Sequence, residues 1–286
     1  MFIFTSFFVF LFGLIIGSFL NVLILRHEKR SLSGRSECFF CSKKLRWFEL
    51  IPIFSFIIQK AKCRHCKNSI SWQYPIVEFV TGLVFVFIFF FLIRSYSVLE
   101  IYDILSLNFI TSFLILIVVW GLLIAIFVYD LYHKIIPDQF VFPFILMSLI
   151  WLFHFVDSEK LFSFPNLWDL FMGLFLFLFF ASLWYFSEGK WMGFGDAKLA
   201  IGMGFLLGFS KGLVAFMFSF WIGAFIAILF ILINKMPLRM VDKYFPKNFK
   251  KITVKSEIPF APFLIIGIAL AFFFDLDFIN TMIFLF

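Results

Sequence analysis

The sequence predicts an all-α polytopic membrane protein with about eight transmembrane helices and a small cytoplasmic loop domain. Of the 286 residues, 63% are hydrophobic and only 14% are charged. Soluble domains have about a quarter charged residues, so a soluble fold could not bury this much apolar surface. Apolar runs of membrane-spanning length recur along the chain, and all four cysteines lie in one polar segment after the first run.

Eight stretches are long and apolar enough, or nearly so, to cross a bilayer, which takes about 20 helical residues. Helix is the expected conformation because an open strand would leave backbone groups unpaired in lipid. The first stretch is too long for the apolar region of a signal peptide, so we expect it to be retained. The sixth is short and glycine-rich, which leaves seven spans as an alternative. The stretches are 2–25, 76–93, 107–129, 138–156, 168–187, 197–210, 212–233 and 258–276.

Basic residues in the connections predict the orientation. With the N-terminus outside, 21 of the 24 Lys and Arg residues fall in the inside segments 26–75, 130–137, 188–198 and 234–257. This bias sets topology under the positive-inside rule. The net charge of +7 therefore indicates membrane topology and contact with lipid headgroups rather than nucleic-acid binding.

The cysteines form two CxxC pairs, Cys38 with Cys41 and Cys63 with Cys66, separated by 21 residues. Tetrahedral zinc takes four soft ligands, and each CxxC turn supplies two of them. A reducing cytoplasm disfavours disulfides. We therefore expect a structural zinc site that folds the loop; four free thiols are the alternative. His65 could in principle replace a cysteine, although a solvated surface histidine is the simpler interpretation.

Two aspartates near membrane depth are the candidate catalytic residues. Asp130 ends the third stretch, and Asp196 follows Gly193-Phe-Gly195 at the start of the sixth. Ionisable residues are costly at this depth and are usually kept for function. Two close carboxyl groups can share a proton, one acting as general base on water and the other as general acid. The structural alternative is that Asp196 caps a helix and Asp130 is a solvated interfacial charge.

Glycines and capping residues accompany these motifs. Gly193 and Gly195 allow a close backbone approach, which an extended substrate could use. Asp138 follows Pro137 and is expected to cap the fourth stretch. In the first stretch, Gly13 and Gly17 form a GxxxG motif suited to helix packing. Ser18 and Asn21 share a face of the same helix; they either make buried interhelical hydrogen bonds or bind the methyl donor or the substrate N-terminus.

The motifs together resemble the prepilin peptidase (type IV leader peptidase) family of GxGD-type membrane aspartic proteases. The resemblance covers nearly the whole chain. It rests on Gly17-Ser-Phe-Leu-Asn-Val22, the two CxxC pairs, Ile70 through Glu78, Asp130 through Asp138, and Gly193-Phe-Gly-Asp-Ala-Lys-Leu199.

This resemblance implies that Asp130 and Asp196 are the catalytic pair of an aspartic endopeptidase in the bacterial inner membrane, with its active site facing the cytoplasm. It implies that the substrates are type IV prepilins or type II secretion pseudopilins, whose short basic leader is removed. It also implies methylation of the new N-terminus with S-adenosylmethionine. The expected domains are the first helix (1–25), the tetra-cysteine zinc domain (26–75) and the peptidase domain (76–286).

Two other functions remain open. A non-enzymatic membrane scaffold of a secretion or pilus machine would not need the aspartates. An ion-coupled transporter would use them as proton sites, but no acidic residue lies in the middle of any stretch. The sequence does not identify the pilin substrate, the residues that bind its leader, the methyl-donor site or the oligomeric state.

Overall fold

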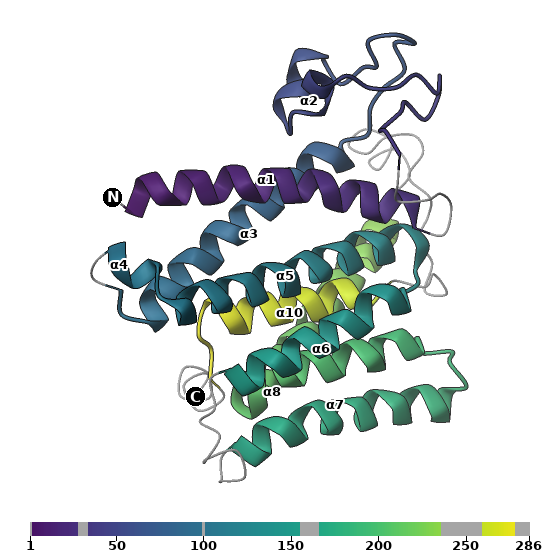
Figure 1. Ribbon diagram of the computed structural model, residues 1–286. Helices are drawn as coiled ribbons and strands as arrows, with labels where there is room; N and C mark the ends of the chain where they lie inside the picture. Colours follow the sequence, from purple (N-terminus) through teal and green to yellow (C-terminus); the bar gives the residue numbers. More distant parts are fainter. Residues whose placement is uncertain (1, 28–33, 99–100, 155–165, 236–258, 278–286) are drawn as a thin grey trace. The chain divides into compact units, whose positions relative to one another are not determined.

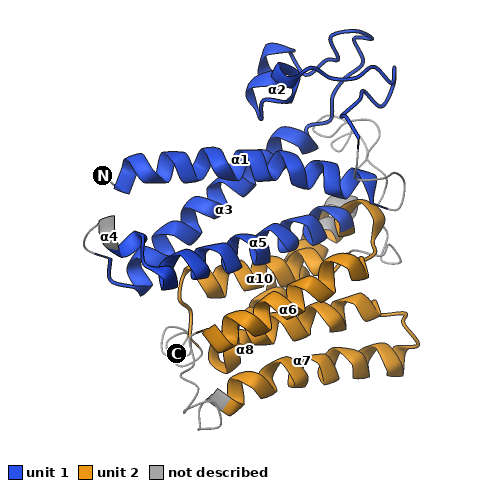
Figure 2. Ribbon diagram, in the orientation of Figure 1, with its two compact units in different colours: residues 1–129 blue, residues 130–286 orange. Residues whose placement is uncertain are grey.

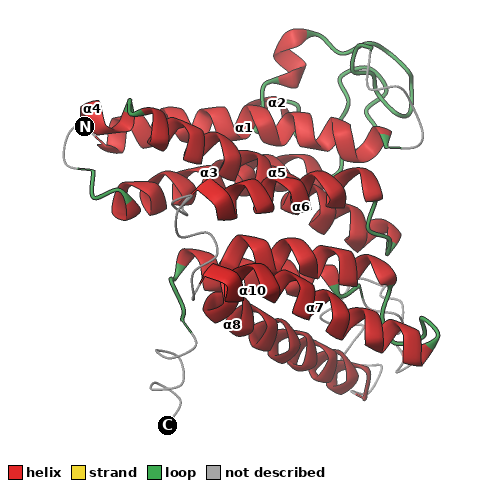
Figure 3. Ribbon diagram, turned by 60° about the horizontal axis from the view of Figure 1, so that its bottom comes forward, coloured by secondary structure: helices red, strands yellow, loops and turns green. Residues whose placement is uncertain are grey.

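The regular structure of the protein is helical. The computed structural model describes residues 2–27, 34–98, 101–154, 166–235 and 259–277 (Figure 1). Over these residues the only extended pairings are two isolated bridges, Glu37 with Lys44 and Lys62 with Ser69, and Figure 3 accordingly shows helices joined by loops. The basic segment 236–258, most of the predicted inside loop 234–257, lies outside the described residues.

Among the described residues seven helices are apolar; five of them are long enough to cross a membrane and two are somewhat shorter. Within the part of the chain that the structure describes, the five that are long and apolar enough to cross a membrane are α1, α3, α5, residues 167–187 of α7 and residues 194–229 of α8. Two more, α6 and α10, are shorter apolar helices. The helices are α1 (Phe2–Arg26), η1 (Trp47–Leu50), α2 (Phe54–Ile58), α3 (Gln73–Ser95), α4 (Ile101–Ile104), α5 (Leu107–His133), α6 (Asp138–His154), α7 (Asn166–Ser187), α8 (Phe194–Lys235) and α10 (Ala261–Phe273). An all-helical, multi-pass architecture is therefore confirmed.

The chain divides into two compact units, residues 1–129 and 130–286 (Figure 2). The boundary falls inside α5, directly before Asp130. The cysteine loop, α1, α3 and most of α5 belong to the first unit. Both candidate aspartates belong to the second unit, so their surroundings can be described within it.

In the first unit, α1 packs closely against α3 through glycines. A Cβ placed on Gly13 would lie 2.7 Å from the Cα of Gly82, and one on Gly17 would lie 2.7 Å from the Cα of Glu78. Real Cβ atoms do not approach backbone this closely, so only glycine allows the two helices to cross here. The packing role predicted for the GxxxG motif is thus confirmed.

In the second unit, α8 is a helical hairpin that turns back at Gly208. Gly208 has φ 69° and ψ −169°, a conformation in which only glycine is unstrained. Before it, Gly204 lies against Gly173 of α7; after it, Phe216 contacts Phe179 and Phe220 contacts Phe180. Up to Gly208 the residues of α8 therefore contact positions progressively nearer the start of α7, and after Gly208 they contact positions progressively farther from that start. The hairpin has two antiparallel arms, which we call α8a (194–207) and α8b (209–235).

Two other helices are aligned on these arms. Gly202 of α8a lies against Phe144 of α6, and Lys198 pairs with Asp138, so α6 and α8a run in the same direction. α10 runs antiparallel to α8b, because Gly267 lies against Ala215 and Ser219 whereas Phe260, just before the helix, contacts Phe220. The starts of α6 and α8a, where Asp138 and Asp196 lie, are therefore at one end of the unit.

Candidate active site and metal centre

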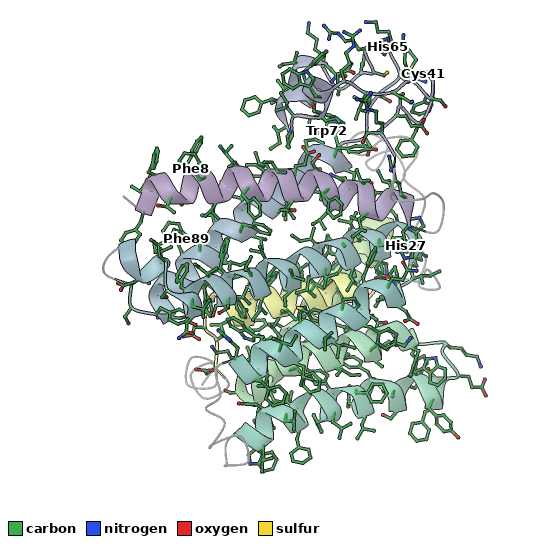
Figure 4. The ribbon with its side chains drawn as sticks, in the orientation of Figure 1. Phe8, His27, Cys41, His65, Trp72 and Phe89 are labelled. Carbon is green, nitrogen blue, oxygen red and sulfur yellow. The ribbon has the colours of Figure 1, made fainter. Side chains whose placement is uncertain are left out.

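The four cysteines form one cluster. Their sulfur atoms all lie within 4.8 Å of one another. Figure 4 shows Cys41 and His65 in the loop domain that precedes α3, with Trp72 where the loop joins this helix. Among the described residues the cluster comprises Cys38, Cys41, Cys63 and Cys66 and does not include His65. The grouping of the two CxxC pairs expected from their spacing is thus present.

The two halves of the cluster repeat one turn. In the first, the N–H of Ser42 donates to the carbonyl of Cys38 at 2.8 Å; in the second, the N–H of Lys67 donates to that of Cys63 at 3.0 Å. Ser42 and Lys67 both have positive φ, 54° and 59°. Each turn directs two sulfur atoms and their neighbouring N–H groups to one point, which suits thiolate ligands.

The geometry of the cluster fits a zinc ion. Zn–S bonds of about 2.3 Å in a tetrahedron place sulfur atoms about 3.8 Å apart. The Sγ atoms of Cys38 and Cys66 are separated by 3.8 Å. Hydrogen bonds from the backbone of Cys66 and His65 lower the pKa of the Cys63 thiol to about 7. The donor set is therefore that of a closed structural metal site, with no position left for a substrate.

Asp130 lies near the end of α5 and is buried, with 4% of its surface exposed. Its carboxylate accepts a hydrogen bond from the backbone N–H of Ala261, the first residue of α10. The first N–H groups of a helix have no partner within the helix and favour a negative charge. The start of α10 thus binds Asp130, which is a buried group and not the solvated interfacial charge of the structural alternative.

Asp196 lies in the first turn of α8 and is also buried, with 7% of its surface exposed. Its carboxylate accepts a hydrogen bond from the backbone N–H of Gly193, and Asp130 is near enough for its charge to act on this carboxylate. The fold therefore brings together two carboxyl groups that are far apart in the sequence. Each is held by a helix start or the turn before one, and the pair is largely shielded from solvent.

The glycines of the GxGD segment have different surroundings. A Cβ on Gly195 would lie 2.9 Å from the Cβ of Ile136, so the absence of a side chain allows Ile136 to pack against the segment. A Cβ on Gly193 would meet the Asp196 carboxylate at 3.6 Å, an ordinary contact. Gly195 thus has a packing role. The approach of a substrate to Gly193 and Gly195 stays a prediction.

Two partners near the aspartates were not expected from the sequence. Lys198, two residues after Asp196, forms a 2.6 Å ion pair with Asp138 and ties the start of α6 to α8a. The N–H of Ala261 is the other. A lysine near membrane depth, such as Lys198, is expected to pair with an anion, and Pro262 indicates a helix start. Neither residue type predicts which carboxylate will be the partner. Glu188 and Lys190 form only an exposed ion pair of 2.9 Å.

Comparison with known proteins agrees with this arrangement. Residues 11–92 match the bacterial peptidase A24 N-terminal domain, and residues 115–228 match the type IV leader peptidase family. No solved structure matches the chain.

Several curated relatives match over most of their length. A prepilin leader peptidase/N-methyltransferase of Bacillus subtilis is 32% identical over 270 residues, which cover 92% of each chain. Proteins of the same name from Stutzerimonas stutzeri and Pseudomonas aeruginosa are 29% and 27% identical, covering 89% and 90% of this chain and 86% of each relative. The chain therefore belongs to the type IV leader peptidase family, together with these prepilin leader peptidase/N-methyltransferases.

Proposed function

We propose that this protein is a prepilin leader peptidase and N-methyltransferase of the bacterial inner membrane. In this proposal it removes the short basic leader of type IV prepilins or type II secretion pseudopilins and methylates the new N-terminus. The observation that carries the proposal is the buried pair Asp130 and Asp196, whose carboxyl groups interact within one unit of a family member. Membership of the family supports both activities.

The paired aspartates are suited to peptide hydrolysis. Two close carboxyl groups do not both ionise easily, so they hold one shared proton. The ionised member takes a proton from a water molecule, which then attacks the scissile carbonyl carbon. The protonated member donates to the leaving amide nitrogen as the C–N bond breaks. The N–H groups of Ala261 and Gly193 would hold the two carboxyl groups in position for this exchange.

The position of the site suits a substrate with an apolar helix and a basic leader. We place eight spans in the membrane: α1, α3, α5, α6, α7, α8a, α8b and α10. With the basic connections in the cytoplasm, the end of α5 and the start of α8a lie at the inner membrane surface. Water, the basic leader and the end of the pilin helix would meet at this depth.

The loop domain would hold one zinc ion through Cys38, Cys41, Cys63 and Cys66. This zinc would have a structural role, since four thiolates leave no coordination position for water or substrate. Metal binding would supply folding energy to a small domain with little apolar core. S-adenosylmethionine supplies the methyl group in the second reaction.

Reaction of the purified protein with a prepilin tests the proposal. The substrate is a full-length prepilin in detergent, with S-adenosylmethionine present, and the readout is the mass of the pilin N-terminus. We expect loss of the leader and a gain of one methyl group. A prepilin that stays intact while the protein is folded and metal-loaded would contradict the proposal and favour a non-enzymatic scaffold.

A further inference from the structure

Glu78 is a buried carboxylate of the first unit that the peptidase mechanism does not use. It lies in the second turn of α3, at the end of this helix that follows the cysteine loop, and has 6% of its surface exposed. The Ile53 N–H donates to its Oε2 at 2.8 Å, and the Ser18 hydroxyl also bonds to it. Both donors are neutral.

The described residues supply no cation to this carboxylate. In the described ranges no Lys, Arg or His forms an ion pair with Glu78. A carboxylate has about four acceptor sites, so two donors do not fill it. Burying an unpaired charge is energetically costly, which is why buried charges are normally paired. The environment of Glu78 is thus suited to a cation that comes from a bound molecule.

A second group beside Glu78 also lacks a donor. Asn21 is fully buried, and its Nδ2 donates to the carbonyls of Gly17 at 3.3 Å and Tyr74 at 3.1 Å. Its Oδ1 accepts no hydrogen bond from the described residues. Ser18 and Asn21 lie one turn apart on α1, and they bond to Glu78 and to Tyr74, which lie one turn apart on α3. The free acceptor therefore belongs to the same α1–α3 contact.

The third observation is strain in the backbone next to Glu78. Ile53 has φ 60° and ψ −51°, which is outside the allowed regions for a β-branched residue. Such a conformation is energetically unfavourable and is concentrated at functional sites. Here it accompanies the N–H that points at the Glu78 carboxylate. Three features therefore occur together. The Glu78 carboxylate lacks a cation, the Asn21 Oδ1 lacks a hydrogen-bond donor among the described residues, and the backbone at Ile53 is strained.

We propose that Glu78 and Asn21 form the amine-binding site of the methylation reaction. This inference rests on the proposed function. An ammonium group has a positive charge for Glu78 and N–H donors for the Oδ1 of Asn21. The α-amino group of the processed pilin lies where the apolar pilin helix meets the cytoplasmic surface, and Glu78 is about 8 Å along α3 from the start of the helix.

The chemical step assigned to Glu78 is proton removal. Its carboxylate takes one proton from the pilin ammonium and so frees the nitrogen lone pair. The nitrogen attacks the methyl carbon of S-adenosylmethionine; the N–C bond forms as the C–S bond breaks, and the sulfonium becomes a neutral thioether. The methylated nitrogen keeps the positive charge, and Glu78 returns its proton to water.

The groups around Glu78 come from three elements. Tyr74 is the titratable side chain on α3 that interacts with Glu78. Helix α1 contributes Ser18 and Asn21, and the turn before α2 contributes the Ile53 N–H.

The test compares Glu78→Gln with Glu49→Gln by the mass of the pilin N-terminus. Glutamine keeps an acceptor for Ile53 and Ser18 but loses the charge. Glu49 is the matched control, because it is buried in the same unit and, among the described residues, accepts only from the backbone N–H of Arg46, at 2.8 Å. We expect Glu78→Gln to cleave the prepilin normally while methylation at about pH 7 falls about 100-fold or more. Glu49→Gln should perform both reactions.

A pH profile separates chemistry from structure. The α-amino group loses its proton in water at a pKa of about 8, so methylation by Glu78→Gln should recover at about pH 9. An equal loss at every pH would contradict the role of Glu78, as would normal methylation by the variant. A wild-type protein that leaves the pilin uncleaved and unmethylated would instead contradict the proposed function itself.

A binding measurement does not depend on turnover or on the variant. The wild-type protein in detergent is titrated with a peptide of the mature pilin N-terminus that carries either a free or an acetylated amine. We expect the free amine to bind about tenfold more tightly or better, because only the charged amine can make a charge-assisted hydrogen bond to the Glu78 carboxylate. Equal affinity for the two peptides would overturn the proposal.

Discussion

At the scale of single residues, the surroundings of the two aspartates explain how buried charge is tolerated. Each carboxylate accepts a backbone N–H at or just before a helix start: Asp130 from Ala261 and Asp196 from Gly193. Within the described residues neither forms an ion pair with a lysine or arginine, and Lys198 is bound by Asp138 instead. The pair thus keeps its mutual interaction without a cation that would neutralise it.

Gly195→Ala tests the packing beside Asp196. The new Cβ would lie 2.9 Å from the Cβ of Ile136. We therefore expect the free energy of unfolding to fall by about 1–3 kcal/mol, which would appear as a lower melting temperature in detergent. Ile136→Gly in the same chain should restore part of the loss, since it removes the Cβ that the alanine side chain would meet. Gly193→Ala is the control and should melt as the wild type does. An unchanged melting temperature for Gly195→Ala would contradict this packing.

The sequence predicted the residues of the candidate site but not most of their partners. The cysteine cluster was predictable because CxxC spacing fixes local geometry and the metal chemistry needs four ligands. The burial of Asp130 by the start of α10, and the pairing of Lys198 with Asp138, depend on contacts across 131 and 60 positions of the chain. No local pattern encodes such contacts, so they appear only in the fold.

At the scale of elements, Gly208 is the position on which the α8 hairpin depends. The turn at Gly208 is stabilised by Asp169, whose Oδ1 accepts a hydrogen bond from the backbone N–H of Phe209 at 2.7 Å. A Cβ on Gly208 would lie 2.5 Å from the same oxygen. The predicted short, glycine-rich sixth stretch is thus α8a, which ends at this turn, and the predicted seventh is α8b.

Gly208→Ala should therefore destabilise the second unit. The positive φ and the clash with Asp169 together predict that the free energy of unfolding falls by about 1–3 kcal/mol or more. The shift of the thermal unfolding midpoint measures this change. Gly212→Ala is the matched control in α8b, because the atoms nearest to its Cβ would be those of the flexible Met172 side chain, at 3.2 Å and beyond. Equal shifts for the two variants would show that the turn does not need glycine.

The loop domain should depend on its metal. We expect about one zinc per chain by elemental analysis, and Cys63→Ser should abolish zinc binding because only three thiolates remain. The helical circular-dichroism signal should change little, since the helices are stabilised by lipid and by packing. His65→Ala should keep its zinc. Metal loss in His65→Ala would contradict the four-cysteine ligand set.

At the scale of the whole molecule, composition and charge alone predicted the class of fold and the orientation of the chain. Apolar runs need helices in lipid, and the distribution of basic residues predicts which connections are cytoplasmic. The seven-span alternative could not be excluded at that level, because a short run followed by glycine is compatible with one bent helix or with two. The contacts of α8 with α7 support the hairpin.

Reporter fusions test this topology. Alkaline phosphatase, which is active only outside the cytoplasm, is fused after Lys190 or after Lys211. The eight-span topology predicts low activity at Lys190 and high activity at Lys211, where the lysine pairs with Asp275 after the end of α10. High activity at both positions, or at neither, would be incompatible with α8a and α8b as separate spans.

The central claim is that Asp130 and Asp196 act together as the peptidase site, and leader removal by single variants tests it most directly. Asp130→Asn, Asp196→Asn and the control Asp138→Asn, whose carboxylate is ion-paired outside the dyad, are each co-expressed with a prepilin, and the mass of the pilin is measured. We expect each dyad variant to lose cleavage by about 100-fold or more while staying folded, and Asp138→Asn to cleave. Cleavage at the wild-type level by either dyad variant would contradict the account.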